Sequence, residues 1–378
     1  MSATQSICLV AGEPSGDLHG ALLVAELKRR HPDWACWGVG SEKMAEAGCD
    51  LWRDAREWSV MGFSHVVRSL PQFHERLKGL TGEIARRRPD RVILIDYPGF
   101  NLKLAPKVHA LGIPVMYYIV PQLWAWGTGR IKIFKRYIDK TVVVFPFEKE
   151  FFLSHDVPCE WIGHPLVDHV RASASRDELR ARLKIGAGEK MVAILPGSRL
   201  QDFESHLPLF TQAVKLIGDR VAGIRWALGL APSLSDTVAP LLNRPDRAAV
   251  PVTTAIYDLI AAADVVLTKT GTATVECALL GTPMVTVYRT GWLNYLIARR
   301  LVKVPFIAMP NLIAGKRLVP ELIQNQATPD AVAREAVEIL SDTNVTESQR
   351  AGLAEVRQRL GPPGAVSRAV GLVEQWLA

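Results

Sequence analysis

The sequence contains few cysteines, no long apolar run and no motif typical of a metal or nucleic-acid site. Its 5 cysteines are odd in number and form no C-x-x-C pair, which indicates buried thiols in a reducing compartment rather than disulfides. No window reaches the roughly 18 apolar residues of a membrane span, and the first residues lack the basic and apolar regions of a signal peptide. We therefore expect a cytoplasmic protein with neither a disulfide framework nor a metal site, and only peripheral contact with any membrane.

The composition is that of a folded protein with a preference for anionic partners. A chain of 378 residues exceeds one ordinary core, so two domains are expected. Its 48% hydrophobic and 22% charged residues exclude an intrinsically disordered chain. The net charge of +7 favours nucleic acid, an anionic membrane surface or a phosphorylated substrate. Because no zinc-finger or RNP-like motif is present, nucleic acid fits least well.

One stretch, Ala263–Arg289, has the pattern of a parallel α/β unit with a ligand-binding loop. Apolar strands are predicted at Val265–Leu267 and Met284–Tyr288, with a helix over Val275–Leu280 between them. The intervening loop Thr270–Thr274 has no large side chain, so its backbone N–H groups can approach a ligand closely. At a helix N-terminus such groups favour an anion, for example a pyrophosphate.

Two further residues of the second half are candidate ligands for a nucleotide. Glu276 lies one turn into the predicted helix, and Ala273 stands where a capping box would need Ser or Thr. Glu276 is therefore either an acceptor for a ribose diol or a solvated first-turn carboxylate. Gly197, Ser198 and Arg199 follow the predicted strand Met191–Leu195 and can present a guanidinium to phosphate oxygens.

The first half contains its own series of predicted strands. These are Ile7–Ala11, Arg91–Ile95, Pro114–Val120, Thr141–Phe145 and Cys159–Ile162, and Ile224–Leu230 and Ala249–Val252 extend the series in the second half. Asp96 directly follows the second strand, and Pro98 and Gly99 then turn the chain. Because residues past the carboxyl ends of parallel strands line the ligand crevice, Asp96 is the candidate proton acceptor. The predicted fold is α/β, with two doubly wound sheets and a cleft between them.

Other loops of the first half add candidates whose roles remain open. After the first strand, Gly12–Asp17 is expected to be a turn, with Asp17 capping a helix that starts near Leu18. Pro121–Gly127 contains two Trp residues, suited to packing or to stacking on a sugar or acyl chain. His164 fits either an acid–base role or a structural role at a domain hinge.

An apolar and basic segment, Val60–Leu80, has two interpretations. Its apolar residues fall at helical spacing and are interrupted by Pro71, which predicts a pair of amphipathic helices facing the core. The alternative is a surface that lies on a membrane, with Met61, Phe63, Val66, Val67 and Leu70 facing the lipid. The basic helix Asn294–Val302 would assist such docking.

Several fragments together resemble one family, lipid-A-disaccharide synthase, a glycosyltransferase of the two-Rossmann-domain (GT-B) type. They are GEPSGDLHGA, VMGF at Val60–Phe63, LIDYPGFN, YYIVPQLWAWG, GHPLVD, LPGSR, LTKTGTATVECALLGTPMVTVYR and PNLIAGKRLVPELIQ. They occur in the family's order and cover nearly the whole chain. After LPGSR the family continues with two residues and then Glu-Ile, where this chain has Asp202-Phe203, so Asp202 is given no role.

The resemblance implies a reaction, a membrane location and a domain plan. UDP-2,3-diacylglucosamine would donate its sugar to 2,3-diacylglucosamine 1-phosphate (lipid X), with inversion and with neither metal nor cofactor. The enzyme would act on the cytoplasmic face of the inner membrane, as a monomer or as a homodimer exchanging C-terminal regions. The expected domains are 1–172 and 185–342, with helices in 346–378 crossing back to the first domain.

The resemblance also implies roles for individual residues. Asp96 would be the general base. The donor would be held by Arg199, Gly197, Ser198, Thr270, Gly271, Thr272, Ala273, Thr274, Glu276 and Asn311. Independently of the resemblance, the loops of the first half supply candidates for the acceptor side of the cleft: Glu13, Ser15, Asp17, His19, Asn101, Gln122 and Trp124.

Two alternatives stay open. The chain could be another GT-B enzyme, such as a UDP-GlcNAc 2-epimerase or a cell-wall glycosyltransferase. It could also be a non-catalytic nucleotide-sugar-binding protein that docks on membranes.

Overall fold

The computed structural model describes residues 4–57, 66–231, 234, 237–238, 251–302 and 304–377, without the side chains of 66–70 and of part of 293–301. The chain forms two compact units. Unit 1 comprises Met1–Pro165, Arg300–Lys303 and Leu360–Ala378, and unit 2 comprises Leu166–Arg299 and Val304–Arg359. The last two helices, expected together on the first domain, thus belong to different units: α17 (Thr343–Arg359) to unit 2 and α18 (Ala365–Leu377) to unit 1.

Unit 1 is built on a seven-stranded sheet in which all recorded strand pairs are parallel, in the order β3-β2-β1-β4-β5-β6-β7. The strands are β1 (Ser6–Ala11), β2 (Ala35–Gly40), β3 (Asp50–Asp54), β4 (Arg91–Ile95), β5 (Val115–Tyr118), β6 (Lys140–Val143) and β7 (Glu160–Trp161). The strand order reverses between β1 and β4, which makes the sheet doubly wound. Strands β2 and β3 were not predicted from the sequence, because ACWGVG and DLWRD lack a continuous apolar run.

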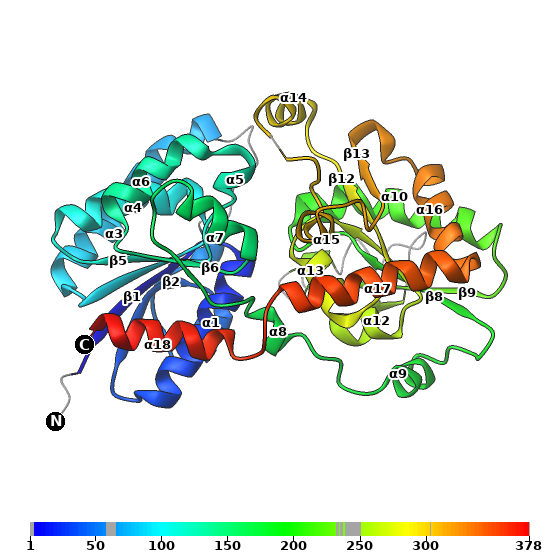
Figure 1. Cartoon of the computed structure of the whole chain (residues 1–378), viewed down its shortest axis with the longest axis horizontal. Coiled ribbons are helices and arrows are strands. Elements are labelled where there is room, and N and C mark those ends of the chain that lie inside the picture. Colours follow the sequence, from blue (N-terminus) through cyan, green and yellow to red (C-terminus); the bar gives the residue numbers. More distant parts are fainter. Residues whose placement is uncertain are drawn as a thin grey trace. The chain divides into compact units, whose positions relative to one another are not determined.

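The helices of unit 1 pack around this sheet (Figure 1). They are α1 (Pro14–Arg30), α2 (Glu42–Glu46), α3 (Val66–Arg87), α4 (Pro98–Ala110), α5 (Leu123–Trp126), α6 (Ile131–Tyr137), α7 (Pro146–Leu153) and α18, with 3-10 turns η1 (Ala55–Glu57) and η3 (Thr128–Arg130). Among them α1 contacts α2 and α18, and α4 contacts α3 and α6.

The predicted pair of helices interrupted at Pro71 is wrong, because α3 continues through the proline. A proline inside a helix removes one backbone hydrogen bond and crowds the carbonyl four residues earlier, and α3 nevertheless continues because its apolar residues after Pro71 are packed in the core. Downstream of Pro71, Leu77, Leu80 and Ile84 are 5%, 0% and 0% exposed. This part of the apolar stripe therefore faces the core, as the packing interpretation predicted.

Unit 2 repeats the plan with a six-stranded parallel sheet in the order β10-β9-β8-β11-β12-β13. Its strands are β8 (Lys190–Leu195), β9 (Ile224–Gly229), β10 (Val252–Thr253), β11 (Val265–Lys269), β12 (Met284–Tyr288) and β13 (Glu321–Ile323). Its helices are α8 (Leu166–His169), α9 (Arg176–Arg182), α10 (Leu200–Gly218), α12 (Ile256–Ala262), α13 (Thr272–Leu280), α15 (Met309–Ala314), α16 (Pro329–Ser341) and α17, with the 3-10 turn η5 (Gln324–Gln326). Helix α14 (Trp292–Leu301) ends in the segment assigned to unit 1. The predicted α/β class with two doubly wound sheets is confirmed.

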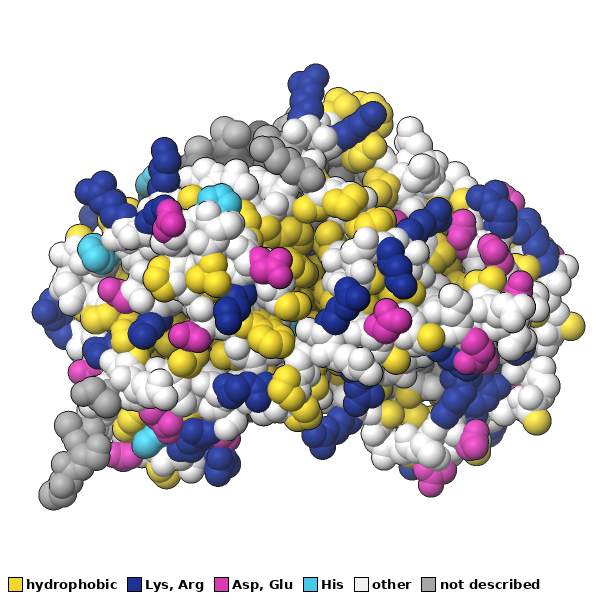
Figure 2. Space-filling view, viewed as in Figure 1, with side chains coloured by type: hydrophobic (Ala, Val, Ile, Leu, Met, Phe, Trp, Pro, Cys, Tyr) yellow, Lys and Arg dark blue, Asp and Glu magenta, His cyan; other side chains and the backbone are white. Residues whose placement is uncertain are grey.

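The central strands read as nearly continuous apolar runs because both faces of each sheet are covered. In β4 the residues Val92–Ile95 are all 0% exposed, and in β11 the run Val265–Leu267 is likewise fully buried. Each unit has its own cluster of buried apolar residues. No helix in the described part of the chain is long and apolar enough to cross a bilayer. On the face shown in Figure 2, Lys and Arg side chains are interspersed with Asp and Glu.

Candidate functional site

Each sheet has one place where ligand-binding loops are expected, the carboxyl edge at its switch point. In unit 2 the switch point lies between β8 and β11, which pair in parallel. The loop Pro196–Arg199 follows β8, and the loop that begins at Thr270 follows β11. Because carboxyl ends of parallel strands meet at one edge, both predicted phosphate loops emerge side by side.

Both loops lead directly into the N-terminus of a helix. Helix α10 starts at Leu200 with Arg199 as its N-cap, and α13 starts at Thr272 with Gly271 as its N-cap. Neither N-cap side chain bonds to the first-turn N–H groups. Gly271, Thr272, Ser198 and Arg199 are exposed. Two neighbouring helix N-termini without side-chain caps form a positive environment suited to a diphosphate.

The loop before α13 contains both exposed residues, Gly271 and Thr272, and buried ones, Thr270 and Thr274. Thr274 is 0% exposed and its hydroxyl donates to the Gly271 carbonyl at 2.7 Å. Thr270 is also buried, at 6% exposed. The Thr274 hydroxyl is therefore used within the loop, and the loop can offer its backbone N–H groups and the exposed Thr272 side chain to a ligand.

Glu276 lies one turn into α13 and is half-buried. The Tyr257 hydroxyl of α12 donates to Glu276 Oε1 at 3.4 Å. Burial, together with the negative charge of Glu276, raises the pKa of Tyr257, so the phenol stays protonated and serves as a donor. The carboxylate is thus oriented by Tyr257 on the neighbouring helix. Tyr257 is 19 residues away in the sequence, and no local pattern predicts this contact.

Asp202, left without a role from the sequence, connects the two phosphate loops. Its carboxylate accepts a hydrogen bond from Lys269 Nζ at 2.8 Å, and both side chains are about one-fifth exposed. Gly197 has φ +127°, and a Cβ there would lie 2.6 Å from the Asp202 Cβ. A glycine is therefore required where α10 approaches the loop. Lys269 ends β11 immediately before Thr270 and adds a cation that the sequence analysis missed.

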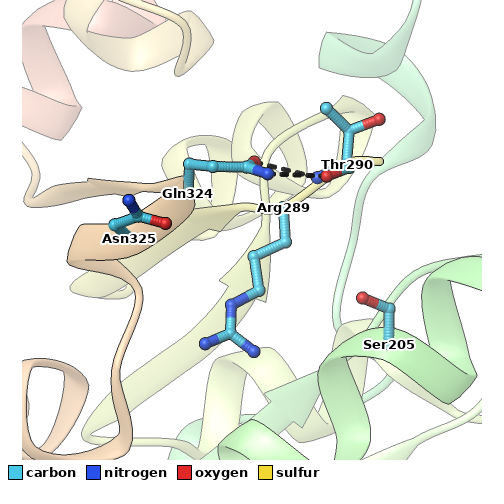
Figure 3. Close-up of a pocket in the computed structure, with 5 residues that line it drawn as sticks. All are labelled: Ser205, Arg289, Thr290, Gln324 and Asn325. Atoms are coloured by element: carbon cyan, nitrogen blue, oxygen red, sulfur yellow. Dashed lines mark hydrogen bonds between the residues drawn. The ribbon is translucent and has the colours of Figure 1, made fainter. Parts of the chain in front are cut away.

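A polar cavity of about 390 Å³ opens near the ends of β12 and β13 (Figure 3). It is lined by Ser205, Arg289, Thr290, Gln324 and Asn325. Gln324 forms a reciprocal pair with the Thr290 backbone, accepting from its N–H at 3.1 Å and donating to its carbonyl at 2.7 Å. One guanidinium nitrogen of Arg289 donates to the Ala327 carbonyl. The cavity thus has a rigid polar wall and one cation.

Asn311 has a structural environment in this fold. It is 0% exposed, and its amide nitrogen donates to the Val319 carbonyl at 2.9 Å and to Glu321 Oε1 at 2.7 Å. Its amide oxygen accepts from the Leu318 and Val319 N–H groups at 2.7 and 2.8 Å. The side chain holds the loop between α15 and β13 in place.

In unit 1 the switch point lies between β1 and β4, and Asp96 directly follows β4 as predicted. Asp96 and Tyr97 have φ of +45° and +47°, so the chain passes through two left-handed residues before α4 begins at Pro98. Two donors meet at the Asp96 carbonyl, the Tyr117 hydroxyl at 2.6 Å and the Asn101 amide at 2.9 Å. Asn101 is 0% exposed and also donates to the Val10 and Ile95 carbonyls.

The loop after β1 differs from the predicted turn. Helix α1 begins already at Pro14, because proline is favoured at the first helical position, and Glu13 is its N-cap. Asp17 does not cap this helix. It is 4% exposed and its carboxylate accepts from the Ser41 N–H at 2.6 Å and the Lys43 N–H at 3.2 Å, where α2 begins. Asp17 is therefore a structural residue, whereas Glu13 and Ser15 remain half-buried at the edge.

The residue directly after β1 is Gly12, and its surroundings leave no room for a side chain. A Cβ at this position would lie 2.2 Å from the Tyr97 ring, so the ring that follows Asp96 packs against bare backbone. The loops after β1 and β4 are thereby in contact. The sequence predicted both loops but not their contact.

The predicted aromatic loop after β5 holds a buried carboxyl. Trp124 Nε1 donates to Glu148 Oε1 at 3.3 Å, and the Val144 and Phe145 N–H groups donate to Oε2 at 3.2 and 3.1 Å. Glu148 is 1% exposed, and burial raises the pKa of its carboxyl to about 7. Trp124 is half-buried, whereas Gln122 is exposed. Trp124 thus packs as part of the loop's framework.

His19 and His164 are both buried in unit 1 and lie next to each other. They are 5% and 4% exposed, and their ring centroids are 5.8 Å apart. Burial, and secondarily the neighbouring His19, holds the pKa of His164 well below its usual range, so its ring is neutral near pH 7. The backbone N–H of His164, not its ring, donates to the Leu360 carbonyl at 2.8 Å. His164 therefore anchors the chain that leads to α18.

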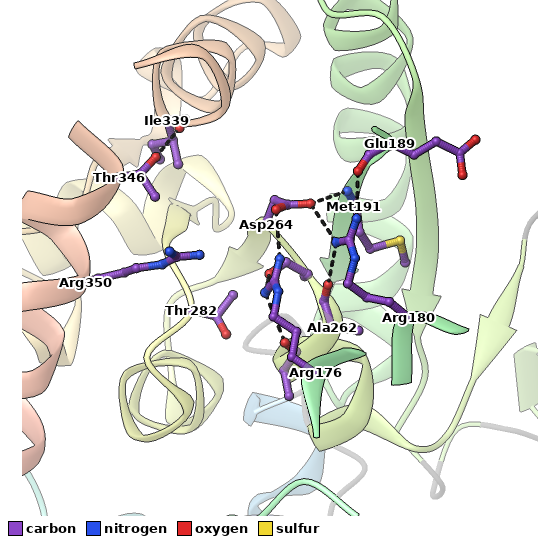
Figure 4. A network of polar contacts seen from close by, with 12 residues as sticks. Arg176, Arg180, Glu189, Met191, Ala262, Asp264, Thr282, Ile339, Thr346 and Arg350 are labelled. Carbon is purple, nitrogen blue, oxygen red and sulfur yellow. Dashed lines mark hydrogen bonds and ion pairs between the residues drawn. The ribbon is translucent and has the colours of Figure 1, made fainter. Parts of the chain in front are cut away.

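The basic stretch before β8 is fixed at the opposite edge of the unit 2 sheet (Figure 4). Arg176 Nη2 lies 2.8 Å from Asp264 Oδ1, and Arg180 Nη1 lies 3.0 Å from Asp264 Oδ2. Asp264 also accepts from the Met191 N–H at 2.7 Å. These arginines join α9 to the amino ends of β8 and β11. Both guanidinium groups are thus paired with the Asp264 carboxylate inside unit 2.

The candidate membrane residues cannot be placed as predicted. Met61 and Phe63 lie outside the described residues, and Val66, Val67 and Leu70 belong to the part of α3 without described side chains. An apolar surface is described elsewhere, on α14. There Trp292 and Leu296 are 58% and 40% exposed, and Arg299 and Arg300 are exposed on the same helix.

The two parallel, doubly wound sheets place the chain in the two-Rossmann-domain (GT-B) fold class. Over 98% of this chain and 100% of the other, the structure resembles the UDP-GlcNAc 2-epimerase from Neisseria meningitidis bound to UDP-GlcNAc, with TM-score 0.67 and 12% identity. It also resembles the calicheamicin glycosyltransferase CalG4, with TM-score 0.62 and 15% identity over 99% of this chain and 98% of that one. At such identities the likeness shows the fold alone.

The sequence is more specific than the fold. The family model described as lipid-A-disaccharide synthetase matches residues 7–369. The lipid-A-disaccharide synthase of Geobacter sulfurreducens is 39% identical, covering 100% of this chain and 98% of its own length. That of Myxococcus xanthus is 37% identical, covering 100% and 99%. The chain belongs to the lipid-A-disaccharide synthase family and is a glycosyltransferase of lipid A biosynthesis.

Proposed function

We propose that the protein transfers 2,3-diacylglucosamine from UDP-2,3-diacylglucosamine to 2,3-diacylglucosamine 1-phosphate and releases UDP. The observation that carries this proposal is the pair of neighbouring loops after β8 and β11, each ending in an exposed helix N-terminus without a side-chain cap. Such an arrangement suits a diphosphate. A family match that spans the whole chain supports the choice of the two lipid substrates.

In the proposed donor complex, the diphosphate lies against the N–H groups of Gly271, Thr272 and Ala273. Arg199 and Lys269 supply positive charge from the two loops. Glu276, oriented by Tyr257, accepts hydrogen bonds from the ribose diol. Asn311 acts indirectly, because its amide is fully used within the α15–β13 loop.

The proposed chemistry is a single in-line displacement. Asp96 accepts the proton of the acceptor's 6-hydroxyl as the oxygen attacks the anomeric carbon of the donor sugar, and the bond to the diphosphate breaks. Because one displacement occurs, the configuration at the anomeric carbon inverts and a β-1′,6 linkage forms. The negative charge that develops on UDP is stabilised by Arg199 and by the two helix N-termini.

The test measures UDP released from UDP-diacylglucosamine with and without lipid X. Release should require both substrates, whereas release without lipid X would indicate hydrolysis or epimerase-like chemistry. Asp96→Asn retains size but removes the proton acceptor, and should lower kcat by roughly 100-fold or more with UDP affinity unchanged. Near-normal kcat in this variant would reject Asp96 as the base and leave His19 and His164 as candidates.

We also propose that the protein docks on an anionic membrane surface, where substrates with such acyl chains reside. The described support is α14, with Trp292 and Leu296 exposed one turn apart and two exposed arginines. Apolar insertion and basic residues together give reversible binding. The segment Val60–Leu70 remains a second candidate.

Replacing both Trp292 and Leu296 with Ser should reduce sedimentation with anionic vesicles without changing the melting temperature. Leu153→Ser is the control for the loss of an exposed apolar side chain, because Leu153 is 50% exposed on α7, where Lys149 is the one basic residue of the helix, whereas α14 carries two. Equal vesicle binding by wild type and the double variant would exclude α14 as the docking surface.

A further inference from the structure

The carboxyl edge of the unit 1 sheet holds three non-glycine residues in left-handed conformations. Asp96 and Tyr97 follow β4 with φ +45° and +47°, and Ile119 follows β5 with φ +60°. This region is unfavourable for residues with a Cβ, and most of all for a β-branched residue such as Ile119. Such conformations persist only where surrounding contacts enforce them, and they cluster at functional sites.

The contacts that enforce the conformation of Asp96 come from the neighbouring strand and from α4. Its N–H donates to the Ile119 carbonyl at 3.2 Å, and its carbonyl accepts the Tyr117 hydroxyl at 2.6 Å. The Asn101 amide donates to the same carbonyl at 2.9 Å. Both main-chain polar groups of Asp96 are therefore fixed, so the peptide has a single favourable orientation.

Tyr117 is the member of this group that reaches the Asp96 carbonyl from the neighbouring strand, and its hydroxyl also interacts with the Asn101 side chain that holds the same carbonyl. It is 0% exposed, and its ring packs on Phe134 with centroids 5.1 Å apart. Burial raises the pKa of Tyr117 well above its usual range, so the hydroxyl remains a donor. A phenylalanine would fill the same space and would lack only the hydroxyl that bonds to the Asp96 carbonyl and interacts with Asn101.

We propose that Tyr117 is a positioning residue for the transfer reaction: its hydroxyl holds the Asp96 peptide left-handed, so that the carboxylate points at the acceptor's hydroxyl. This inference rests on the proposed function, in which Asp96 is the base. Without the hydroxyl the peptide can relax toward a more common conformation, which changes the direction of the Asp96 Cα–Cβ bond. The carboxylate would then be displaced from the reacting proton.

The first experiment is Tyr117→Phe, which keeps the ring and removes only the hydroxyl. Because small displacements of a reacting group are costly, kcat should fall roughly 10- to 100-fold. The KM values for both substrates and the dissociation constant of UDP should not change, since Tyr117 contacts neither. The stoichiometry of a calorimetric titration with UDP gives the concentration of folded enzyme. Because kcat is calculated per folded enzyme, a loss of folded protein is not mistaken for a loss of kcat.

The adjacent residue provides a matched control. Tyr118 is also 0% exposed, points to the opposite face of the sheet, and its hydroxyl has no hydrogen-bond partner within the described residues. Tyr118→Phe should leave kcat unchanged. Equal losses of kcat in both variants would overturn the inference, because they would reflect general damage to β5.

A double-mutant cycle distinguishes positioning from a general effect. In an Asp96→Asn background Tyr117→Phe should have no further effect, because the group it positions is gone. Tyr117→Phe with normal kcat, or with the same fold-loss in the Asp96→Asn background, overturns the inference while the proposed function stands. Near-normal kcat in Asp96→Asn alone overturns the inference together with the assignment of Asp96 as the base, whereas UDP release that does not require lipid X overturns the proposed transfer itself.

Discussion

Glu148 is a buried carboxyl whose three hydrogen-bond donors come from two different segments, β6–α7 and the Trp124 loop. It is the third residue of α7, and one of these three bonds, from the Phe145 N–H, joins it to the N-cap residue of that helix. Desolvation outweighs these donors and raises the pKa of the carboxyl from 4.5 to about 7. The contribution of Glu148 to the free energy of unfolding therefore depends on pH.

The sign of that dependence follows from proton linkage. The folded state keeps the Glu148 proton up to about pH 7, whereas the unfolded state releases it near 4.5, so the free energy of unfolding falls as pH rises through this range. The difference corresponds to about 3 kcal/mol at most. Glu148→Gln cannot titrate. Urea unfolding at pH 5 and pH 8 should therefore show wild type losing its advantage over the variant at the higher pH.

The control for this measurement lies on the same helix. Glu150 is exposed on α7, so Glu150→Gln should follow the wild-type pH dependence. Parallel pH dependence of wild type and Glu148→Gln would contradict a raised pKa at Glu148. These variants test a property of one side chain and need no substrate.

At the scale of elements, α10 and β11 are joined by the Asp202–Lys269 pair at the edge where the diphosphate is proposed to bind. The two residues carry opposite charges, so their removal has opposite electrostatic consequences. Lys269→Met removes a cation and leaves a carboxylate beside the phosphates. It should weaken UDP binding roughly tenfold or more, about 1.4 kcal/mol.

Asp202→Asn removes the anion instead, and on electrostatic grounds it should leave UDP affinity unchanged or increase it. Calorimetry on both variants gives the comparison, with Arg199→Ala as a reference for losing an exposed cation at the same edge. Equal weakening by Lys269→Met and Asp202→Asn would show that the pair acts as a structural tie between α10 and β11. Unchanged affinity in all three variants would remove the diphosphate from this edge.

At the scale of the whole chain, the C-terminal helix α18 belongs to unit 1 although α17 belongs to unit 2. Figure 1 shows α18 lying along α1, in agreement with their contacts. Glu374 bonds to Arg30 and His31 at 3.1 and 2.7 Å, and the Arg91 guanidinium lies over the Trp376 ring. The first unit is therefore completed by the last residues of the chain.

Disrupting the packing of α18 within unit 1 should destabilise unit 1 without altering the proposed UDP site in unit 2. Val373 of α18 is 0% exposed, so Val373→Asp buries a charge and should cost on the order of 3 kcal/mol of unit 1 stability. Gln375→Asp introduces the same charge at an exposed position of the helix and is the control. Scanning calorimetry should show a lowered transition for Val373→Asp only, with UDP affinity retained. A loss of UDP affinity would instead show that unit 2 depends on α18.

The sequence by itself determined the elements that depend on local pattern. Continuous apolar runs predicted β1, β4, β8 and β12 within a residue or so, because buried parallel strands need apolar side chains on both faces. Glycine and proline marked the loops at both switch points, where backbone must approach a ligand or turn sharply. The motifs around Asp96, Arg199 and Thr270–Thr274 also identified the family, which the comparison with known proteins bears out.

Only the tertiary structure decided which polar groups meet. Asp202 and Lys269 lie 67 residues apart, and Tyr117 and Asp96 lie 21 apart. No local periodicity records such pairs, because they exist only once the strands are ordered in the sheet. The same holds for Asp17, whose carboxylate caps α2 rather than α1, and for Asn311, whose amide is used within its own loop. Residue type and spacing identify a candidate, and long-range packing decides whether its polar atoms face a ligand or the fold.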